Sequence, residues 1–251
     1  MSGPGGQFWG GFHPTCPMNR PLAVAVAVLC VAQACTSDAD RSGGEQRQAT
    51  TPDTGVRTLF DGVSTRGWRG FRRPDAPTGW QVVDSALTRV GEGGDLITDG
   101  QFENFELALE WKIREGGNSG IMFRVTEDAE QAYYTGPEMQ VLDDAHHRDG
   151  GSRLTSAGSN YGLHAAPDGV VRSPGQWNAV RLVVNGAHVE HWLNGVKVVE
   201  YELWTAAWDS LVRASKFAQW PGYGRARKGH IVLQDHGDWV AYRHISIRVL
   251  P

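Results

Sequence analysis

The segment Phe105–Ile113 alternates between apolar and polar positions over its whole length. The apolar set is Leu107, Leu109, Trp111 and Ile113, and the charged set between them is Glu106, Glu110 and Lys112. Successive side chains of a β-strand point to opposite faces of a sheet. The pattern therefore predicts a strand with one face in a hydrophobic core and the other toward solvent, in a register that a slip of one residue would destroy.

Two Asn-Gly pairs extend this interpretation to a series of hairpins. Asn185-Gly186 and Asn194-Gly195 are typical of two-residue turns, and together they predict a three-strand meander. Further short strands, rich in β-branched or aromatic residues, are expected at Thr58–Phe60, Trp80–Asp84, Asp95–Thr98, Gly120–Val125, Glu138–Asp143 and Trp177–Val184. Only Thr205–Gln219 has helical spacing. About a dozen strands in one domain favour an all-β sandwich or jelly roll over a small barrel.

The N-terminal part of the chain has the pattern of an export signal. An apolar run, Pro21–Cys35, follows the basic residue Arg20 and is short for a membrane span, and Met18 is a plausible true start. The run ends in Ala34-Cys35, which resembles the signal of bacterial lipoproteins, in which the cysteine is lipidated. We therefore expect an exported protein of the cell envelope, held at the membrane only through a lipid on Cys35, with ordinary secretion as the alternative.

The domain organisation follows from composition. Residues 1–35 are expected to be the signal, residues 36–56 a flexible polar tether, and residues 57–251 one β-sandwich domain. The three cysteines, Cys16, Cys30 and Cys35, all lie in the leader, so the domain has neither a disulfide nor thiolate chemistry. A formal net charge of −4, with both signs interspersed, gives no indication of nucleic-acid binding.

The segment Gly229–Gly237 has polar side chains at positions that are unusual for an ordinary half-buried strand. Ile231 and Leu233 share one face, whereas Gln234 and His236 lie on the other. Polar groups on a rigid strand are costly unless a partner or ligand satisfies them. Arg243, farther along, is in phase with apolar residues, and we interpret it as structural, paired with Asp235 or another carboxylate.

A second predicted strand also has an apolar face and a face with a carboxamide and an ionisable side chain. In Pro137–Asp143, Met139 and Val141 share one face, so Glu138 and Gln140 face either solvent or a groove. Each of the two strands thus presents a carboxamide and an ionisable group on one face. This pattern fits a sheet that binds a ligand as well as it fits a solvent-exposed surface. Glu138 could serve as general acid or base, and the unperturbed pKa of histidine near 6.5 would suit His236 to proton transfer.

Other candidate site residues have ordinary structural alternatives. Asp143, Asp144, His146 and His147 form a cluster that could hold a divalent metal, although no zinc motif is present and loop histidines are often solvated. We expect no cofactor beyond such an ion. Asn118 precedes a Ser-Gly turn signal but could also reach a ligand. Most tryptophans should pack in the core, while Trp204, Trp208 and Trp220 are candidates for stacking on a sugar ring.

The same segments, in order, resemble the bacterial 3-keto-disaccharide hydrolase domain. The blocks that carry the resemblance are Leu59–Trp68, Gly116–Ile121, Pro137–Asp143, Gly175–Asn178, His191–Gly195 and Gly229–Gly237, within about residues 56–250. The resemblance implies a concanavalin A-like jelly roll of two curved antiparallel sheets with a carbohydrate site on the concave one. It also implies an enzyme that cleaves glycosides whose sugar is oxidised at C3.

The chemistry of such substrates suggests roles for the candidate residues. A C3 ketone acidifies the C2 proton, so a base can form an enolate, the C1 oxygen can leave by elimination, and water can then add. We expect Glu138 as the leading acid or base and His236 as a second proton-transfer group or metal ligand. Sugar hydroxyls or the keto oxygen would be held by Asn118, Arg124, Gln140 and Gln234, with Tyr161 as a further donor and Trp220 as a stacking platform. The alternative is a non-catalytic carbohydrate-binding module on the same fold.

Overall fold

The computed structural model describes residues 55–251, which belong to one compact unit. The predicted signal, the lipidation site Cys35 and nearly all of the predicted tether lie outside the described residues. Between residues 55 and 251, no helix is long and apolar enough to cross a bilayer.

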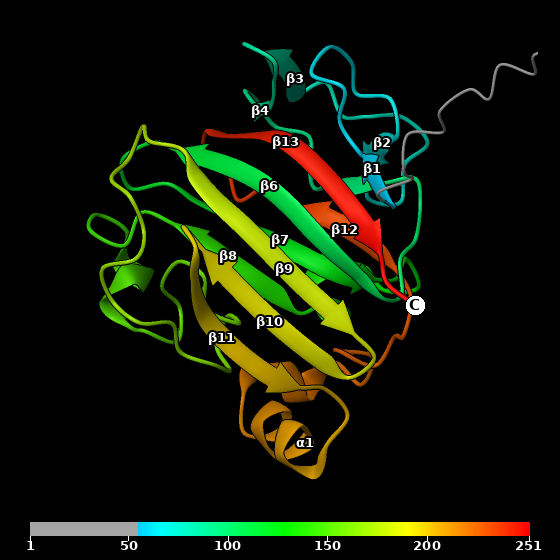
Figure 1. Cartoon of the computed structure of the whole chain (residues 1–251), viewed down its shortest axis with the longest axis vertical. Coiled ribbons are helices and arrows are strands. Elements are labelled where there is room, and N and C mark those ends of the chain that lie inside the picture. The colour runs from blue at the N-terminus through cyan, green and yellow to red at the C-terminus, as the bar shows by residue number, and fades with distance from the viewer. Residues whose placement is uncertain (1–54) are drawn as a thin grey trace, which may run out of the picture. The chain divides into compact units, whose positions relative to one another are not determined.

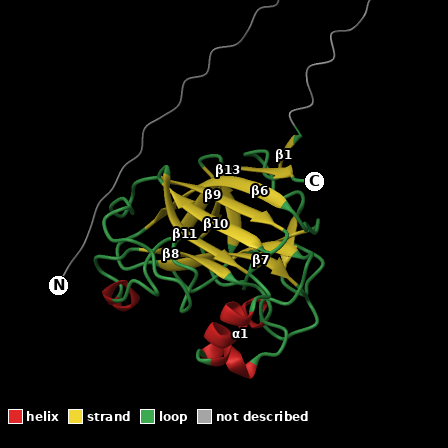
Figure 2. Ribbon diagram, turned by 60° about the horizontal axis from the view of Figure 1, so that its bottom comes forward, coloured by secondary structure: helices red, strands yellow, loops and turns green. Residues whose placement is uncertain are grey.

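The described residues form two antiparallel sheets stacked face to face (Figures 1 and 2). The larger sheet has eight strands in the order β11-β10-β9-β6-β13-β4-β3, with β1 paired to β13. Its strands are β1 (Val56–Thr58), β3 (Trp80–Val83), β4 (Ala86–Arg89), β6 (Phe105–Ile113), β9 (Asn178–Asn185), β10 (His188–Leu193), β11 (Val196–Glu202) and β13 (Val240–Val249). The expectation of a jelly-roll β-sandwich is confirmed.

The smaller sheet has five strands in the order β2-β5-β12-β7-β8. Its strands are β2 (Trp68–Gly70), β5 (Leu96–Thr98), β7 (Asn118–Val125), β8 (Glu138–Leu142) and β12 (His230–Leu233). The helical elements are η1 (Ala132–Tyr134), η2 (Arg148–Gly151), α1 (Ala206–Arg213) and η3 (Lys216–Gln219). All of them lie in the connections around β7, β8 and β12.

The main core lies between the two sheets. Strand β6 contributes every second residue to it, as its alternation predicts, and the residues between are half-buried. Strands β7 and β8 differ, because every residue in both is buried. Their inner faces pack in the core, and long connections cover their outer faces. Polar residues on the outer faces are therefore enclosed.

Three local expectations need correction. The first hairpin turns at Gly186-Ala187, because Asn185 pairs with His188; Gly at the first turn position, with φ of 59°, suits a type II′ turn. The turn at Asn194-Gly195 is confirmed by the pairing of Leu193 with Val196. The first strand begins at Val56, inside the predicted tether, because it pairs with the C-terminal strand.

The third correction concerns the predicted helix, which is two shorter elements. Thr205 caps the start of α1 by accepting a hydrogen bond from the backbone N–H of Trp208, and α1 ends at Arg213. Ser215 then caps η3 through the backbone N–H of Phe217. A serine hydroxyl that bonds its local backbone competes with helix continuation, and the break turns η3 in a new direction.

Candidate active site

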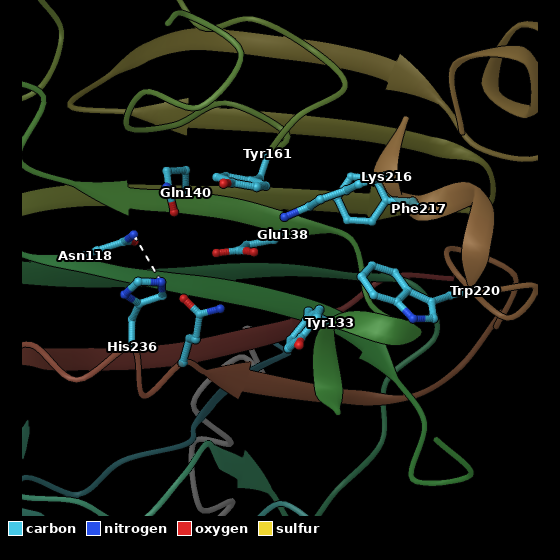
Figure 3. Close-up of a pocket in the computed structure, with 10 residues that line it drawn as sticks. Asn118, Tyr133, Glu138, Gln140, Tyr161, Lys216, Phe217, Trp220 and His236 are labelled. Carbon is cyan, nitrogen blue, oxygen red and sulfur yellow. Dashed lines mark hydrogen bonds between the residues drawn. The ribbon is translucent and has the colours of Figure 1, made fainter. Parts of the chain in front are cut away.

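A pocket of about 360 Å³ lies over the outer face of the smaller sheet. Its lining residues are Asn118, Tyr133, Glu138, Gln140, Tyr161, Lys216, Phe217, Trp220, Gln234 and His236 (Figure 3). Seven of them are the predicted site residues Asn118, Glu138, Gln140, Tyr161, Trp220, Gln234 and His236. The sheet and three long connections thus bring together residues that are far apart in the sequence.

Strand phase positions the floor of this pocket. Met139 and Val141 are fully buried in the main core, so Glu138 and Gln140 point outward from β8 into the pocket. The choice between a groove and a solvated face is settled in favour of the groove, since Glu138 is 8% exposed and Gln140 is 1% exposed. Asn118 joins them from the start of β7.

The structure does not bring Arg124 to the pocket. Strict alternation along β7 would place it on the same face as Asn118, but the register between β7 and β12 shifts opposite this residue, and Arg124 has φ of 52°. A β-bulge of this kind re-aims a side chain. The Arg124 guanidinium donates to the backbone oxygen of Glu103, at 2.7 and 3.1 Å, and lies over the Trp204 ring.

Glu138 is the one carboxylic acid among the described residues that line the pocket, and its pKa is strongly shifted. Burial raises the pKa of its carboxyl to about 8, while the positive charge of Lys216 opposes that rise and the carboxylates of Asp95 and Asp149 add to it. No group among residues 55–251 donates a hydrogen bond to this carboxyl. A buried carboxyl with a raised pKa is a common feature of catalytic acids and bases.

Gly120 makes room for the Glu138 carboxyl. On the neighbouring strand β7, Gly120 pairs with Gln140, and a Cβ atom at Gly120 would lie 2.7 Å from Glu138 Cδ and closer still to Oε1. No side chain larger than hydrogen fits there without moving the acid. The carboxyl therefore rests over bare backbone in the middle of the pocket.

Lys216 and Tyr161 lie beside Glu138, and the Lys216 ammonium points toward its carboxyl (Figure 3). Lys216 Nζ is 4.2 Å from the centroid of the Tyr161 ring. The residue as a whole is exposed, yet partial burial of its ammonium lowers the pKa of Lys216, against the opposing effect of Glu138 and Asp149. The Tyr161 hydroxyl donates to Asp149 Oδ2 at 3.2 Å, and burial raises the pKa of Tyr161 to about 12.

Lys216 was not predicted from the sequence, and neither were Tyr133 and Phe217. Lys216 and Phe217 belong to a short 3₁₀ turn and Tyr133 to another, and such turns have no periodicity that would indicate which residues face a pocket.

One end of the pocket is polar. Asn118 Oδ1 and Gln234 Oε1 are buried without a hydrogen-bond partner from residues 55–251. Asn118 Nδ2 lies 3.5 Å from His236 Nε2, at the exposed side of this end. The Gln140 amide, in contrast, bonds its own chain: Oε1 accepts from Val141 N–H, and Nε2 donates to Thr155 O. Asn118 and Gln234 are therefore better placed than Gln140 to receive a ligand.

The other end is aromatic. Trp220 stacks on Tyr134, with ring centroids 4.4 Å apart, and the edge of Tyr133 meets it at 5.4 Å. The two other tryptophans proposed as platforms are not part of this pocket. Trp208 is 1% exposed within an aromatic stack, and Trp204 donates from Nε1 to Gly224 O while two arginines flank its ring.

The histidines of the predicted metal cluster already have protein partners. His146 Nδ1 lies 2.8 Å from Asp143 Oδ2, and His147 Nδ1 accepts the backbone N–H of Asp149. Arg243 pairs with Glu110 at 2.6 Å, as expected for a structural arginine, while Asp235 pairs with Arg89.

The charge of Lys216 gives a testable dependence on pH. If the ionised Glu138 carboxylate is the working base, kcat/KM should rise with pH through about 8. Lys216→Met removes a charge that lowers the pKa of Glu138, so the rise should move to higher pH. Lys228→Met, which changes an exposed lysine outside the pocket, should leave the midpoint in place. A midpoint that stays fixed or falls in Lys216→Met would contradict this electrostatic coupling.

Comparison with known proteins identifies the family of this chain. A family model described as a 3-keto-alpha-glucoside-1,2-lyase-like domain matches residues 55–248. A protein of Bacteroides thetaiotaomicron named 3-keto-disaccharide hydrolase is 36% identical over 228 residues, which cover 78% of this chain and 79% of the relative. The chain belongs to this family.

Solved structures support the family assignment. A proposed glycosyl hydrolase from Parabacteroides distasonis has a TM-score of 0.74 at 31% identity, over 78% of this chain and 94% of that one. A second from the same organism has a TM-score of 0.58 at 29% identity, over 78% of this chain and 99% of that one. The match to the 3-keto-alpha-glucoside-1,2-lyase-like family covers the β-sandwich up to Arg248, the second-last residue of β13, and it includes every residue that lines the pocket.

Proposed function

We propose that this protein cleaves the glycosidic bond of 3-keto-glycosides, with Glu138 as the base that removes the C2 proton. The observation that carries the proposal is the Glu138 carboxyl itself. It is buried in a pocket of about 360 Å³, receives no hydrogen bond from residues 55–251, and burial raises its pKa to about 8. Once ionised, such a carboxylate is a stronger base than an ordinary one.

The proposed reaction proceeds by elimination and hydration. Glu138 takes the C2 proton, and the electrons of the C2–H bond form an enolate with the C3 carbonyl. When the carbonyl re-forms, a C1–C2 double bond appears, the C1–O bond breaks, and the leaving oxygen takes a proton from an acid. Water then adds its hydroxyl to C1 and its proton to C2, which gives a net hydrolysis. The description of the family as a 1,2-lyase fits the first stage.

Other pocket residues suit the remaining charges and protons of this reaction. The Lys216 ammonium, close to the carboxyl, can stabilise the negative charge of an enolate. Tyr161, beside Glu138, can donate a proton to the leaving oxygen, and His236 is a second proton-transfer group at the polar end. Asn118 and Gln234 have unpartnered amide oxygens that can accept hydrogen bonds from sugar hydroxyls.

An ordinary glycosidase mechanism suits this pocket less well. It uses two carboxyl groups across the scissile bond. Among the described residues that line the pocket, Glu138 is the one carboxylic acid. The aromatic end and the neutral amides would also serve a carbohydrate-binding module, but binding alone does not need an acid in an environment that raises its pKa so far.

The test compares two substrates. The protein should cleave a 3-keto-disaccharide and leave the unoxidised parent disaccharide intact, because the parent has no acidic C2 proton. His236→Ala should lower the rate on the keto-sugar if His236 transfers a proton. Binding of both sugars without cleavage of either would favour the binding module, and cleavage of the parent would favour an ordinary glycosidase.

A further inference from the structure

The pocket is chemically divided along its length. Asn118 and His236 gather at one end, Tyr133 and Trp220 at the other, and Glu138 lies between them (Figure 3). Gln234 directly follows β12, and its backbone N–H donates to Gly120 O on β7, two residues from Asn118. A ligand that fills the whole pocket therefore meets hydrogen-bonding groups at one end and aromatic rings at the other.

The polar end suits the oxidised sugar. Two buried amide oxygens without protein partners, Asn118 Oδ1 and Gln234 Oε1, are costly unless a ligand or water satisfies them. A pyranose ring presents several hydroxyl donors that can bond such oxygens, whereas an apolar group presents none. The sugar whose C2 proton is removed must also place that carbon beside Glu138, which borders this end.

The aromatic end is held in place before any ligand arrives. Tyr134 stacks on Trp220 at 4.4 Å with an interplanar angle of 21°, and Tyr133 meets Trp220 edge-on at 5.4 Å. Phe217 packs against Trp220 at 6.0 Å and is itself stacked on Tyr223 at 4.0 Å. A ring supported in this way loses little conformational freedom when a flat apolar group packs against it.

From this polarity we infer that the leaving group of the substrate lies against Trp220 and Tyr133, and that the enzyme prefers glycosides whose aglycone has a flat apolar face. The inference rests on the proposed function, because it assigns the scissile bond to the space beside Glu138. Trp220 and Tyr133 then determine specificity, and the amides at the opposite end fix the direction in which the sugar enters.

The test uses methyl and benzyl 3-keto-α-glucosides with the full-length protein. Methanol and benzyl alcohol have nearly equal acidity, so a difference in kcat/KM between the two reports contacts of the aglycone and not leaving-group chemistry. An aromatic contact of the usual strength predicts about a twofold to tenfold preference for the benzyl glycoside. In Trp220→Ala the benzyl-to-methyl ratio should fall to about one.

A matched control and a second variant keep the result interpretable. Trp192→Ala removes a half-buried tryptophan of β10, outside the pocket, and should keep the wild-type ratio. Tyr133→Ala should reduce the ratio in the same direction as Trp220→Ala, and thermal unfolding shows whether either variant is folded. Binding of both glycosides to Glu138→Gln, in which cleavage is slow, is measured by calorimetry and should show the same preference.

The outcomes separate the two proposals. If wild type cleaves both glycosides equally, or if both aromatic variants keep the benzyl preference, the leaving-group assignment is wrong while the proposed function stands. If neither glycoside is cleaved but benzyl binds more tightly than methyl in wild type and not in Trp220→Ala, the platform stands and the proposed function is wrong. If neither is cleaved and both bind equally, both proposals are wrong.

Discussion

Glu138→Gln should lower kcat on a 3-keto-disaccharide by about 10²–10⁴-fold, the usual contribution of a positioned general base. Glutamine keeps the shape of the side chain but does not accept a proton at neutral pH. KM should change much less, because the sugar is held by Asn118, Gln234 and the aromatic end. A variant with full turnover would show that Glu138 is not the base.

The same substitution should also change the stability of the fold, by an amount that depends on pH. Burial raises the pKa of Glu138 from an ordinary value of 4.5 to about 8. Between these values the folded protein holds a proton that the unfolded chain releases, so the Glu138 contribution to stability is greatest below pH 4.5 and is lost as pH rises through 8. Glutamine does not ionise in this range, so Glu138→Gln removes this loss of stability at higher pH.

The gain in Tm of Glu138→Gln over wild type should therefore be small near pH 4.5 and larger at pH 8, as measured by thermal unfolding across that range. A residue that costs stability and provides activity is typical of an active site. A difference that shrinks as pH rises would mean that the folded protein does not raise the pKa of this carboxyl.

Gly120→Ala should abolish most of the activity. The cause would be displacement of the Glu138 carboxyl, and not contact between the new methyl group and the substrate. The added Cβ would lie 2.7 Å from Glu138 Cδ, so the flexible carboxyl has to move. A misplacement of about 1 Å can cost about 10²-fold in rate. Overpacking of this kind should destabilise the fold by about 1–3 kcal/mol, less than is needed to unfold a typical domain.

Gly151→Ala is the matched control for this variant. No atom lies within 4 Å of a Cβ added at Gly151, and its backbone has negative φ, so both activity and Tm should stay near wild type. If Gly120→Ala were folded and as active as Gly151→Ala, the position of Glu138 over Gly120 would not matter for the reaction.

The sequence predicts the floor of the site better than its walls. Alternation along β8 predicts that Glu138 and Gln140 point outward. Neighbouring residues of a strand point to opposite faces of the sheet, and Met139 and Val141 lie in the core. The same reasoning fails for Arg124, since a bulge in β7 interrupts the alternation. Nothing in the sequence around this residue marks the bulge.

The walls come from long connections, where side-chain direction depends on contacts that form only in the folded protein. Lys216 illustrates this dependence, because its place beside Glu138 follows from the break between α1 and η3. The hairpin at Gly186-Ala187 is a smaller example: the Asn185-Gly186 pair predicts a turn, but the observed turn lies one residue later.

The most direct test of the central claim is the cleavage of a 3-keto-disaccharide in D₂O, followed by NMR of the keto-sugar product, which contains C1 and C2. If Glu138 removes the C2 proton before the bond breaks, the product should be either the C1–C2 unsaturated keto-sugar or a hydrated keto-sugar with deuterium at C2. Incubation of the free product without enzyme controls for spontaneous exchange. A product that keeps its original C2 hydrogen would contradict the proposed mechanism.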